Sequence, residues 1–230
     1  MTYDLYIGDR TFSSWSLRGW LMFAAFDIPV RVHDVGLYSG RMAEDLAPLA
    51  PARLVPVMRT PEGTVVGDTL AMAETLAERH PDAGLWPSDP AHRAQARWLV
   101  AEMHSGFTAL RGDCPMMLAH RWEGFRPSEA VRADLARIER LWDGAPGDGW
   151  LFGAYSLADV FYAPVAARIG TYGLPVGDRA RAYVARHMAE PHFREWRDTG
   201  LRQSYDPMPY ELDLPRLDWP EPDSESGPRR

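Results

Sequence analysis

The first part of the chain changes its hydrophobic period twice, and this alternation limits the possible folds more than any other feature. Residues 3–7 (YDLYI) and residues 28–35 (IPVRVHDV) alternate apolar with polar side chains, as strands do. Between them the apolar side chains follow the spacing of one helix face: Leu17, Trp20, Leu21, Ala24 and Ala25. Two strands separated by a helix are typical of a parallel βαβ unit, so we expect an α/β domain at the N-terminus.

The segment after this unit predicts a hairpin and a further helix. Residues 41–46 fit a short helix, and residues 55–58 and 64–66 fit two short strands joined by a turn with proline and glycine. Residues 69–79 place their apolar side chains on one helical stripe. We therefore expect a βαβ–ββα domain over residues 1–80.

The remaining chain predicts helices followed by a proline-rich tail. Residues 81–90 (PDAGLWPSDP) predict a linker, because they are rich in Pro, Asp and Gly. Residues 91–202 predict an all-helical domain, and residues 203–230 a tail without a periodic apolar face. The helices are expected where apolar stripes recur: a long one carrying Leu99, Met103, Phe107 and Leu110, then Val131 to Trp142, 156–169 and 183–197.

Composition and charge exclude several classes of protein. The formal net charge of −7, from 25 Lys and Arg against 32 Asp and Glu, argues against nucleic acid as a partner. The longest strongly apolar run, residues 20–26, is much shorter than the roughly 20 residues of a membrane span. The single cysteine, Cys114, cannot form an intramolecular disulfide. Asp4, Asp9 and Arg10 stand where a signal peptide would need an apolar stretch, so none is expected. We expect a soluble, cytoplasmic protein.

Motifs for metal or nucleotide binding are missing from the sequence. No HExxH, paired CxxC, Asp-rich calcium loop, GxGxxG or Walker loop occurs, so no metal site is expected. Cys114 lies outside the turn singled out below and is expected to be buried rather than nucleophilic.

The turn Phe12–Ser16 (FSSWS), before the first helix, is the first candidate site. Its serines can simply cap the helix. A helix N-terminus also presents unpaired N–H groups and a positive partial charge, which stabilise an anion such as a thiolate. A serine hydroxyl there can donate a hydrogen bond to a bound sulfur.

Two further turns combine residues that suit a peptide-like ligand. Pro56 stands at the entry of a predicted strand, where a cis Val55–Pro56 bond would turn the Val55 backbone toward a ligand; an ordinary edge-strand proline is the alternative. Asp68 and Thr69 open the third helix, where either can cap it. Together they can also hold an ammonium and a carboxylate.

The fourth feature is structural. Ser156-Leu157-Ala158-Asp159 is an S-x-x-D capping box, with which a helix satisfies its own first amides.

In this order and spacing, the four features resemble those of the glutathione S-transferase superfamily, over roughly residues 3–202. The resemblance implies a thioredoxin-like N-terminal domain and an all-helical C-terminal domain. The motif SSWSLR, from Ser13 to Arg18, resembles the serine motif of the Zeta class, which contains maleylacetoacetate isomerases. In that register Trp15 stands where the Zeta motif has cysteine.

The resemblance also implies roles for individual residues. Ser13 would be the catalytic residue beside the glutathione sulfur, with Ser14 and Ser16 as alternatives if the register slips. Val55 would hydrogen-bond the cysteinyl part of glutathione through its backbone, next to a cis Pro56. Asp68 and Thr69 would hold the γ-glutamyl end of glutathione. Arg53 would hold the glycyl end, because Leu54 stands where many members of the family have Lys or Gln.

A second pocket is expected on the helix that begins at residue 91. His104, Ser105 and Thr108 lie opposite its apolar stripe, where they either form a solvated face or line the cleft between the domains. In the cleft, His104 would be a general acid or base, because an imidazole titrates near neutral pH.

These expectations together predict a glutathione S-transferase-like enzyme. It would activate the glutathione thiol for attack on a small hydrophobic electrophile, by conjugation or isomerisation, and the resemblance implies a homodimer. The alternatives are a non-catalytic binding module of the same fold and a glutathione-dependent peroxidase or reductase.

Overall fold

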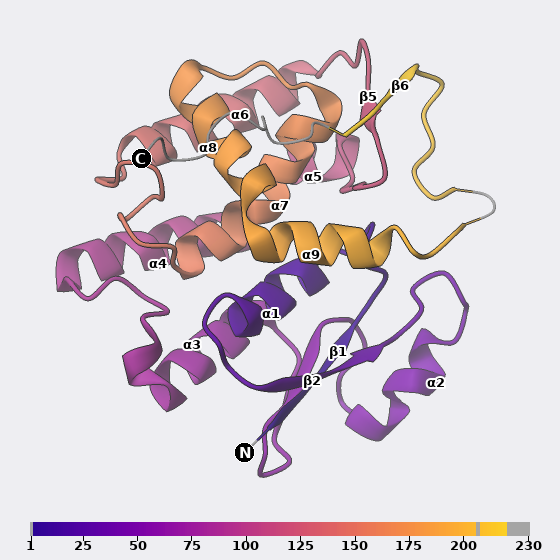
Figure 1. The fold of residues 1–230 in the computed structure, drawn as a ribbon, viewed down its shortest axis with the longest axis vertical. Coiled ribbons are helices and arrows are strands. Elements are labelled where there is room, and N and C mark those ends of the chain that lie inside the picture. The colour runs from indigo at the N-terminus through magenta and orange to yellow at the C-terminus, as the bar shows by residue number, and fades with distance from the viewer. Residues whose placement is uncertain (1, 206–207, 220–230) are drawn as a thin grey trace, which may run out of the picture.

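The N-terminal part forms a four-stranded mixed sheet (Figure 1). The computed structural model describes residues 2–205 and 208–219. The strands lie in the order β2-β1-β3-β4, where β1 pairs parallel with β2 and antiparallel with β3, and β3 pairs antiparallel with β4. Their bounds are β1 Tyr3–Ile7, β2 Val30–Asp34, β3 Val57–Arg59 and β4 Val65–Val66. The predicted parallel unit and hairpin are confirmed, with strands slightly shorter than expected.

Helices cover both faces of this sheet. α1 and α3 pack on one face, and α2 with a following 3-10 turn lies on the other (Figure 1). Their bounds are α1 Ser14–Ala24, α2 Met42–Leu46, the turn Ala47–Leu49 and α3 Thr69–Arg79. Gly19 of α1 touches Pro56, because a Cβ at Gly19 would come within 2.9 Å of the proline Cγ. This close approach places the loop that contains Pro56, just before β3, against α1; this loop is called the proline loop below.

The rest of the described chain is mainly helical, as predicted. α7 is its centre: almost every residue is buried, and it packs on α1, α4 and α8. This explains why α7 reads as apolar on all sides rather than amphipathic. The helices are α4 Pro90–Ser105, α5 Thr108–Asp113, α6 Glu129–Asp143, α7 Leu157–Tyr172, α8 Asp178–Ala189 and α9 Pro191–Gly200.

Two of the predicted helices are wrong in their extent. The long helix that was to carry Phe107 and Leu110 ends at Ser105, because Phe107 adopts a left-handed conformation with φ of 54°. The last predicted helix divides at Glu190, whose side chain caps α9 while Pro191 starts it. In the first case the buried face continues across the break, so periodicity alone did not reveal it.

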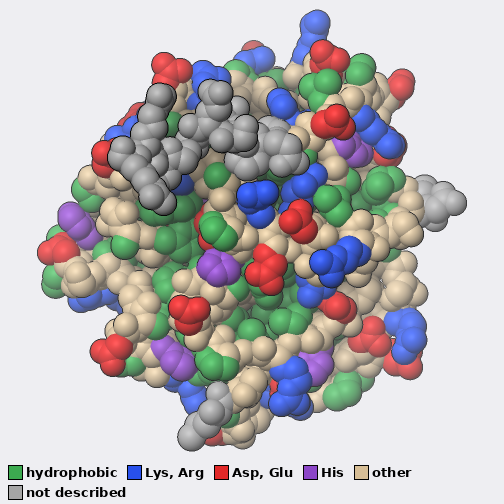
Figure 2. Space-filling model, in the orientation of Figure 1, with side chains coloured by type: hydrophobic (Ala, Val, Ile, Leu, Met, Phe, Trp, Pro, Cys, Tyr) green, Lys and Arg blue, Asp and Glu red, His purple; other side chains and the backbone are tan. Residues whose placement is uncertain are grey.

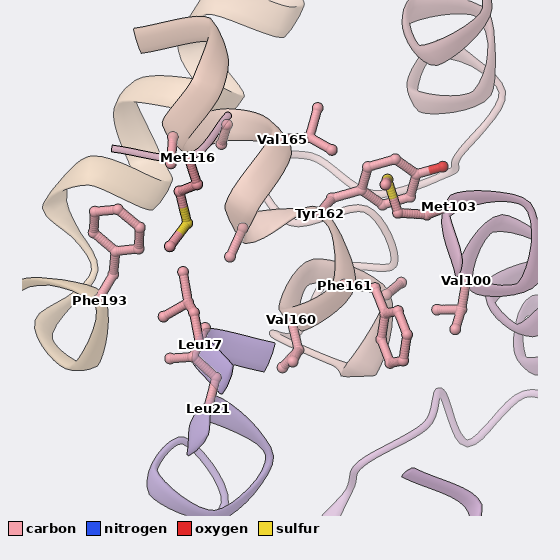
Figure 3. Close-up of a cluster of buried hydrophobic side chains, with 14 of the residues drawn as sticks. Leu17, Leu21, Val100, Met103, Met116, Val160, Phe161, Tyr162, Val165 and Phe193 are labelled. Carbon is pink, nitrogen blue, oxygen red and sulfur yellow. The ribbon is translucent and has the colours of Figure 1, made fainter. Parts of the chain in front are cut away.

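The two parts of the molecule share one hydrophobic core. Leu17 and Leu21 of α1 belong to one buried cluster with Val160 of α7, Met116 and Phe193, and Leu17 extends toward Met116 (Figure 3). All of these side chains are buried. The shared core fixes the N-terminus of α1 against the helical part. The domain boundaries proposed from the sequence, at 1–80, 81–90, 91–202 and 203–230, stay predictions.

The tail lies against the body of the protein where it is described. Its strand β6, Arg216–Leu217, pairs antiparallel with β5, Arg121–Trp122. Tyr205 donates a hydrogen bond to Asp9 at 2.8 Å. The remainder of the predicted tail, 206–207 and 220–230, falls outside the described residues.

The described part of the chain contains no helix that could span a membrane and no cluster of metal ligands. None of its helices combines the length and the apolar run that a bilayer crossing needs. Within the same residues, no three His, Cys, Asp or Glu side chains gather as metal ligands. On the face shown in Figure 2, acidic and basic side chains are interspersed rather than collected in one patch.

Candidate functional site

The N-terminus of α1 is built by a chain of serine hydrogen bonds. Ser13 is the N-cap: its Oγ accepts from the Ser16 backbone N–H at 3.3 Å, and its hydroxyl donates to Ser16 Oγ at 2.8 Å. Ser16 Oγ in turn accepts from the Gly8 N–H at 2.9 Å. Because Ser13 is only 8% exposed and its proton is already in use, the structural capping role is present at this residue.

Ser14 has a different environment. It is the first residue of α1 and is half-buried, and its Oγ accepts from Arg168 Nη2 at 3.3 Å. Within residues 2–205 and 208–219, no acceptor takes the proton of this hydroxyl. Ser16 is fully buried, so Ser14 is the accessible serine whose hydroxyl is free to donate to a ligand, with a guanidinium beside it.

Three arginines surround this turn. Arg18 and Arg111 both lie over the ring of Trp15, at 4.5 and 5.0 Å from its centroid. Arg168 reaches the same region from α7 and is held by its Nε, which donates to the Cys114 carbonyl at 2.8 Å. The residues come from α1, α5 and α7, so only the tertiary fold brings them together.

These guanidinium groups have no acidic partners in the described structure. None of the ion pairs there involves Arg18, Arg111 or Arg168. Arg18 donates through Nε to the Phe161 carbonyl at 2.9 Å, but its buried Nη1 and Nη2 have no hydrogen-bond partner. Burial and the neighbouring arginines lower the pKa of Arg18, and burial lowers the pKa of Arg168 to about 10. At this pKa Arg168 remains cationic at neutral pH.

The sequence reasoning did not identify Arg111 or Arg168 as site residues. One signal was available for Arg168, because it is the only basic residue in the mostly apolar helix α7. A buried charge needs a specific partner or function. Arg111 carried no such signal, since it lies in a short helix next to other polar residues.

The second part of the site is the proline loop. The Val55–Pro56 bond is cis, as the resemblance implied, and β3 begins only at Val57, so the Val55 backbone lies beyond the paired sheet. Beside it is a hollow of about 520 Å³. Its walls come from the residues before the cis proline and from β4 and the turn after it: Pro51, Ala52, Arg53, Leu54, Val65 and Gly67. Leu54 is 69% exposed at this hollow.

The third part is the start of α3. Asp68 caps the helix through Oδ1, which accepts from the N–H groups of Leu70 at 2.8 Å and Ala71 at 3.1 Å. Its other oxygen lies 2.8 Å from Nε2 of His104 on α4. Burial raises the pKa of Asp68, but the Ala71 amide and the His104 imidazole outweigh it, so the pKa is lowered from its ordinary value. Thr69 is buried, and its hydroxyl has no hydrogen-bond partner among the described residues.

The residues predicted for a second pocket separate into two groups. His104 lies at the site, where its ring contacts the edge of Trp15 at 5.2 Å between centroids as well as Asp68. Ser105 and Thr108 are exposed, and the Ser105 hydroxyl donates to the Ala101 carbonyl of its own helix at 3.0 Å. Among the residues that the structure describes, no hydrogen bond or ring contact links Ser105 or Thr108 to the serine turn, and their pocket role stays a prediction.

Comparison with known protein families decides the identity of the fold. The model described as glutathione S-transferase, N-terminal domain, matches residues 12–79, and the corresponding C-terminal domain model matches residues 128–199. A maleylacetoacetate isomerase from Pseudomonas aeruginosa is 32% identical over 208 residues, which cover 83% of this chain and 93% of that protein. The chain belongs to the glutathione S-transferase family. A maleylacetoacetate isomerase from Rattus norvegicus is 27% identical, over 71% of this chain and 76% of its own.

Solved glutathione transferase structures share the same fold. A homologue from Burkholderia, solved with bound glutathione, superposes with a TM-score of 0.67 at 22% identity, covering 89% of this chain and all (100%) of that one. An Omega-class enzyme from Trametes versicolor, in complex with 2,4-dihydroxybenzophenone, gives a TM-score of 0.65 at 20% identity, over 87% and 96% of the two chains. The expected fold class is thereby confirmed.

Two structural expectations about individual residues are also met in this glutathione S-transferase chain. Ser156 and Asp159 form the capping box of α7. Cys114 is buried, and burial raises the pKa of its thiol to about 12, so it remains a protonated thiol at neutral pH.

Proposed function

We propose that this protein binds glutathione and adds its thiolate to an electrophilic carbon of a small carboxylic acid, with isomerisation as the main reaction. The family supports glutathione as the cosubstrate, and the relatives named maleylacetoacetate isomerase support isomerisation. The observation that carries the substrate class is the group of arginines without acidic partners beside Ser14.

Thiolate formation follows from three sources of stabilisation at one turn. A free thiol has a pKa of about 8.5, and each unit of lowering corresponds to about 1.4 kcal/mol. The N-terminus of a helix contributes up to about 2 kcal/mol in a partly buried site, and a hydrogen bond to a charged group about 1.5–3 kcal/mol. We assign that hydrogen bond to Ser14, and Arg168 adds positive charge behind it. Ser13 is the alternative donor.

The rest of glutathione is assigned to the two neighbouring turns. The backbone of Val55, beside the cis Pro56, would pair with the cysteinyl amide. Asp68 and Thr69 would take the γ-glutamyl ammonium and carboxylate, and His104 would position Asp68 through their contact. Arg53 would face the glycyl carboxylate in the hollow at Leu54. The assignment is supported by the position of Arg53, which is one of the residues that line this hollow.

The arginines suit a substrate that carries a carboxylate. A guanidinium presents a planar fork of N–H donors that matches a carboxylate with two hydrogen bonds. Arg111 is the accessible member of the group, because Arg18 and Arg168 are buried. We assign the substrate carboxylate to Arg111 and the electrophilic carbon to the space between Trp15 and Ser14.

Isomerisation needs no group beyond this site. The thiolate adds to a carbon–carbon double bond conjugated to a carbonyl, and the electron pair moves onto the carbonyl oxygen. The former double bond is then single and rotates. Expulsion of the thiolate restores the double bond in the other geometry, so glutathione is regenerated and no atoms are gained or lost.

The test is steady-state kinetics with glutathione and maleylacetoacetate, beside a neutral electrophile such as 1-chloro-2,4-dinitrobenzene. Arg111→Met is expected to lower kcat/KM for the acid about tenfold or more, since a hydrogen bond to a charged group is lost, and to change it less than twofold for the neutral compound. Equal losses on both substrates would contradict the role of Arg111. Retention on immobilised glutathione without any turnover would instead favour the non-catalytic module.

We also propose that the protein is a cytoplasmic homodimer that acts in detoxification, as the family resemblance implies. Sedimentation equilibrium of the full chain measures the assembly directly, and a monomeric mass at all concentrations would contradict it.

A further inference from the structure

Trp15 stands where the serine motif of the Zeta class has cysteine, and its ring meets two arginines. It is the second residue of α1 and is half-buried. Arg18 follows three positions later, so both side chains leave the same face of this helix. Arg111 reaches the same ring from α5. The indole therefore lies where two positively charged side chains come together.

The indole ring is the common contact of these two guanidinium groups. The Cζ of Arg18 lies 4.5 Å from the ring centroid, and that of Arg111 lies 5.0 Å from it. Burial, and after it the charges of Arg168 and Arg111, lower the pKa of Arg18, so the arginines repel one another. An aromatic face is partly negative and attracts a cation placed over it. Trp15 thus supplies attraction at a place where the arginines alone repel.

An arginine–tryptophan pair elsewhere in the molecule shows what is different here. Arg137 lies over the ring of Trp98, 5.8 Å from its centroid, and donates from Nε and Nη2 to Glu102 at 2.6 and 2.8 Å. At Trp15, neither arginine pairs with a carboxylate among the described residues. An aromatic face attracts the charge but does not occupy the fork of N–H donors as a carboxylate does.

Further contacts hold this arrangement beside the glutathione site. Nη1 of Arg111 donates to the carbonyls of His104 at 3.5 Å and Gly106 at 3.3 Å. Its Nε and Nη2 have no hydrogen-bond partner in the described part of the chain. The ring of His104 in turn meets that of Trp15 edge to face, with centroids 5.2 Å apart. One nitrogen of the guanidinium is thus anchored, and the contact with Trp15 sets the direction of the other two.

We propose that Trp15 is a positioning residue, whose ring holds Arg111 at the serine turn with Nε and Nη2 free for the carboxylate of the substrate. This inference rests on the proposed function and adds the residue that orients the arginine. A cysteine at this position has no ring face to offer, and an acidic residue would take the donors itself. Trp15 therefore raises the affinity for acids by acting through Arg111.

The experiment is isothermal titration calorimetry of the full chain with two ligands, S-methylglutathione and S-(1,2-dicarboxyethyl)glutathione. Only the second carries carboxylates beside the sulfur, so the ratio of the two affinities measures the carboxylate contact. Trp15→Leu removes the ring, and we expect the ratio to fall about tenfold. Trp15→Phe keeps an aromatic face and is expected to stay within about threefold of the wild type. Trp98→Leu, at the pair whose arginine already holds a carboxylate, is the matched control and is expected to leave the ratio unchanged.

A double-mutant cycle tests whether Trp15 acts through Arg111. Arg111→Met is expected to lower the ratio about tenfold, and adding Trp15→Leu to it to change the ratio less than about twofold further. Trp15→Cys, which introduces the residue of the Zeta motif, is expected to lose the same ratio as Trp15→Leu, so the test does not depend on one variant folding.

The outcomes separate this inference from the proposed function. A ratio kept in both Trp15→Leu and Trp15→Cys, or losses that add in the double variant, would overturn the role of Trp15 while the role of Arg111 stands. Absence of binding by either ligand, or a ratio that Arg111→Met leaves unchanged, would instead contradict the proposed function and this inference with it.

Discussion

The helices α1 and α7 both have a serine at the N-cap, and their N-termini use their hydrogen-bonding groups in opposite ways. At α7, Asp159 is fully buried and accepts four hydrogen bonds. Oδ1 accepts from the Leu151 N–H at 3.1 Å and the Tyr183 hydroxyl at 2.9 Å. Oδ2 accepts from the Ser156 N–H at 2.9 Å and its hydroxyl at 3.1 Å. This N-terminus is complete without a ligand.

The N-terminus of α1 leaves donors unused. The proton of Ser14 has no acceptor in the described structure, and two nitrogens of Arg18 are buried without partners. Unsatisfied buried polar groups reduce the stability of a protein, typically by about 1–3 kcal/mol each. The comparison teaches that a saturated helix N-terminus serves stability, whereas an unsaturated one beside uncompensated positive charge is prepared for an anion.

The largest expected effect is on stability, at the saturated N-terminus of α7. Asp159→Ala leaves four buried donors without an acceptor, so we expect the free energy of unfolding to fall by about 4 kcal/mol. Urea denaturation at neutral pH measures it. The matched control is Asp68→Ala, which removes an exposed helix cap and is expected to cost about 1 kcal/mol. Similar losses of unfolding free energy in both variants would contradict the special role of the buried carboxylate at α7.

The next effect is a pH dependence of stability. Burial outweighs the hydrogen bonds and raises the pKa of Asp159 to about 6, above its ordinary value of 3.8. Between about pH 4 and pH 6 the folded state therefore binds more protons than the unfolded state, so this group's contribution to stability falls as the pH rises. The integrated change is about 3 kcal/mol.

Comparing the wild type with a variant at Asp159 removes the contribution of all other titrating groups to the pH dependence of stability. Urea curves for the wild type and Asp159→Asn are recorded from pH 4 to pH 7, and the difference between the two proteins isolates this carboxyl group. We expect the stability advantage of the wild type over the variant to shrink as the pH rises through this interval. A difference independent of pH would contradict a raised pKa.

The smallest expected effect is at the unsaturated N-terminus of α1. Ser14→Ala removes the free hydroxyl donor. The pKa of the thiol of bound glutathione is therefore expected to rise by about one unit, equivalent to about 1.4 kcal/mol. Titration of the thiolate absorbance in the complex measures it. Ser13→Ala is the matched control, because the Ser13 proton already goes to Ser16, and it is expected to leave the midpoint in place. A shift in Ser13→Ala alone would reverse the assignment.

The sequence predicted local features best. The capping box of Ser156 and Asp159 and the cap at Asp68 depend on contacts between residues two or three positions apart, so spacing alone reveals them. The position of the cis Pro56 came from the family resemblance. The break at Phe107 was missed because a short interruption keeps the same face buried.

The candidate site was only partly predictable for the same reason. Ser13, Val55 and Asp68 lie in turns whose local sequence suggests ligand contact. Arg168 meets Ser14 across a separation of 154 residues, and His104 meets Asp68 across 36. No local pattern records such pairs, because they depend on how α1 and α4 pack against their neighbours.

The sequence by itself determined the order of strands and helices, the caps that begin them, and the turns that offer hydrogen-bond donors, since these follow from short-range spacing and backbone preference. Only the tertiary structure decided which serine keeps its proton free and which arginines stand beside it without a carboxylate. Those properties depend on burial and on charges from distant segments, which exist only after α1 has packed against α7.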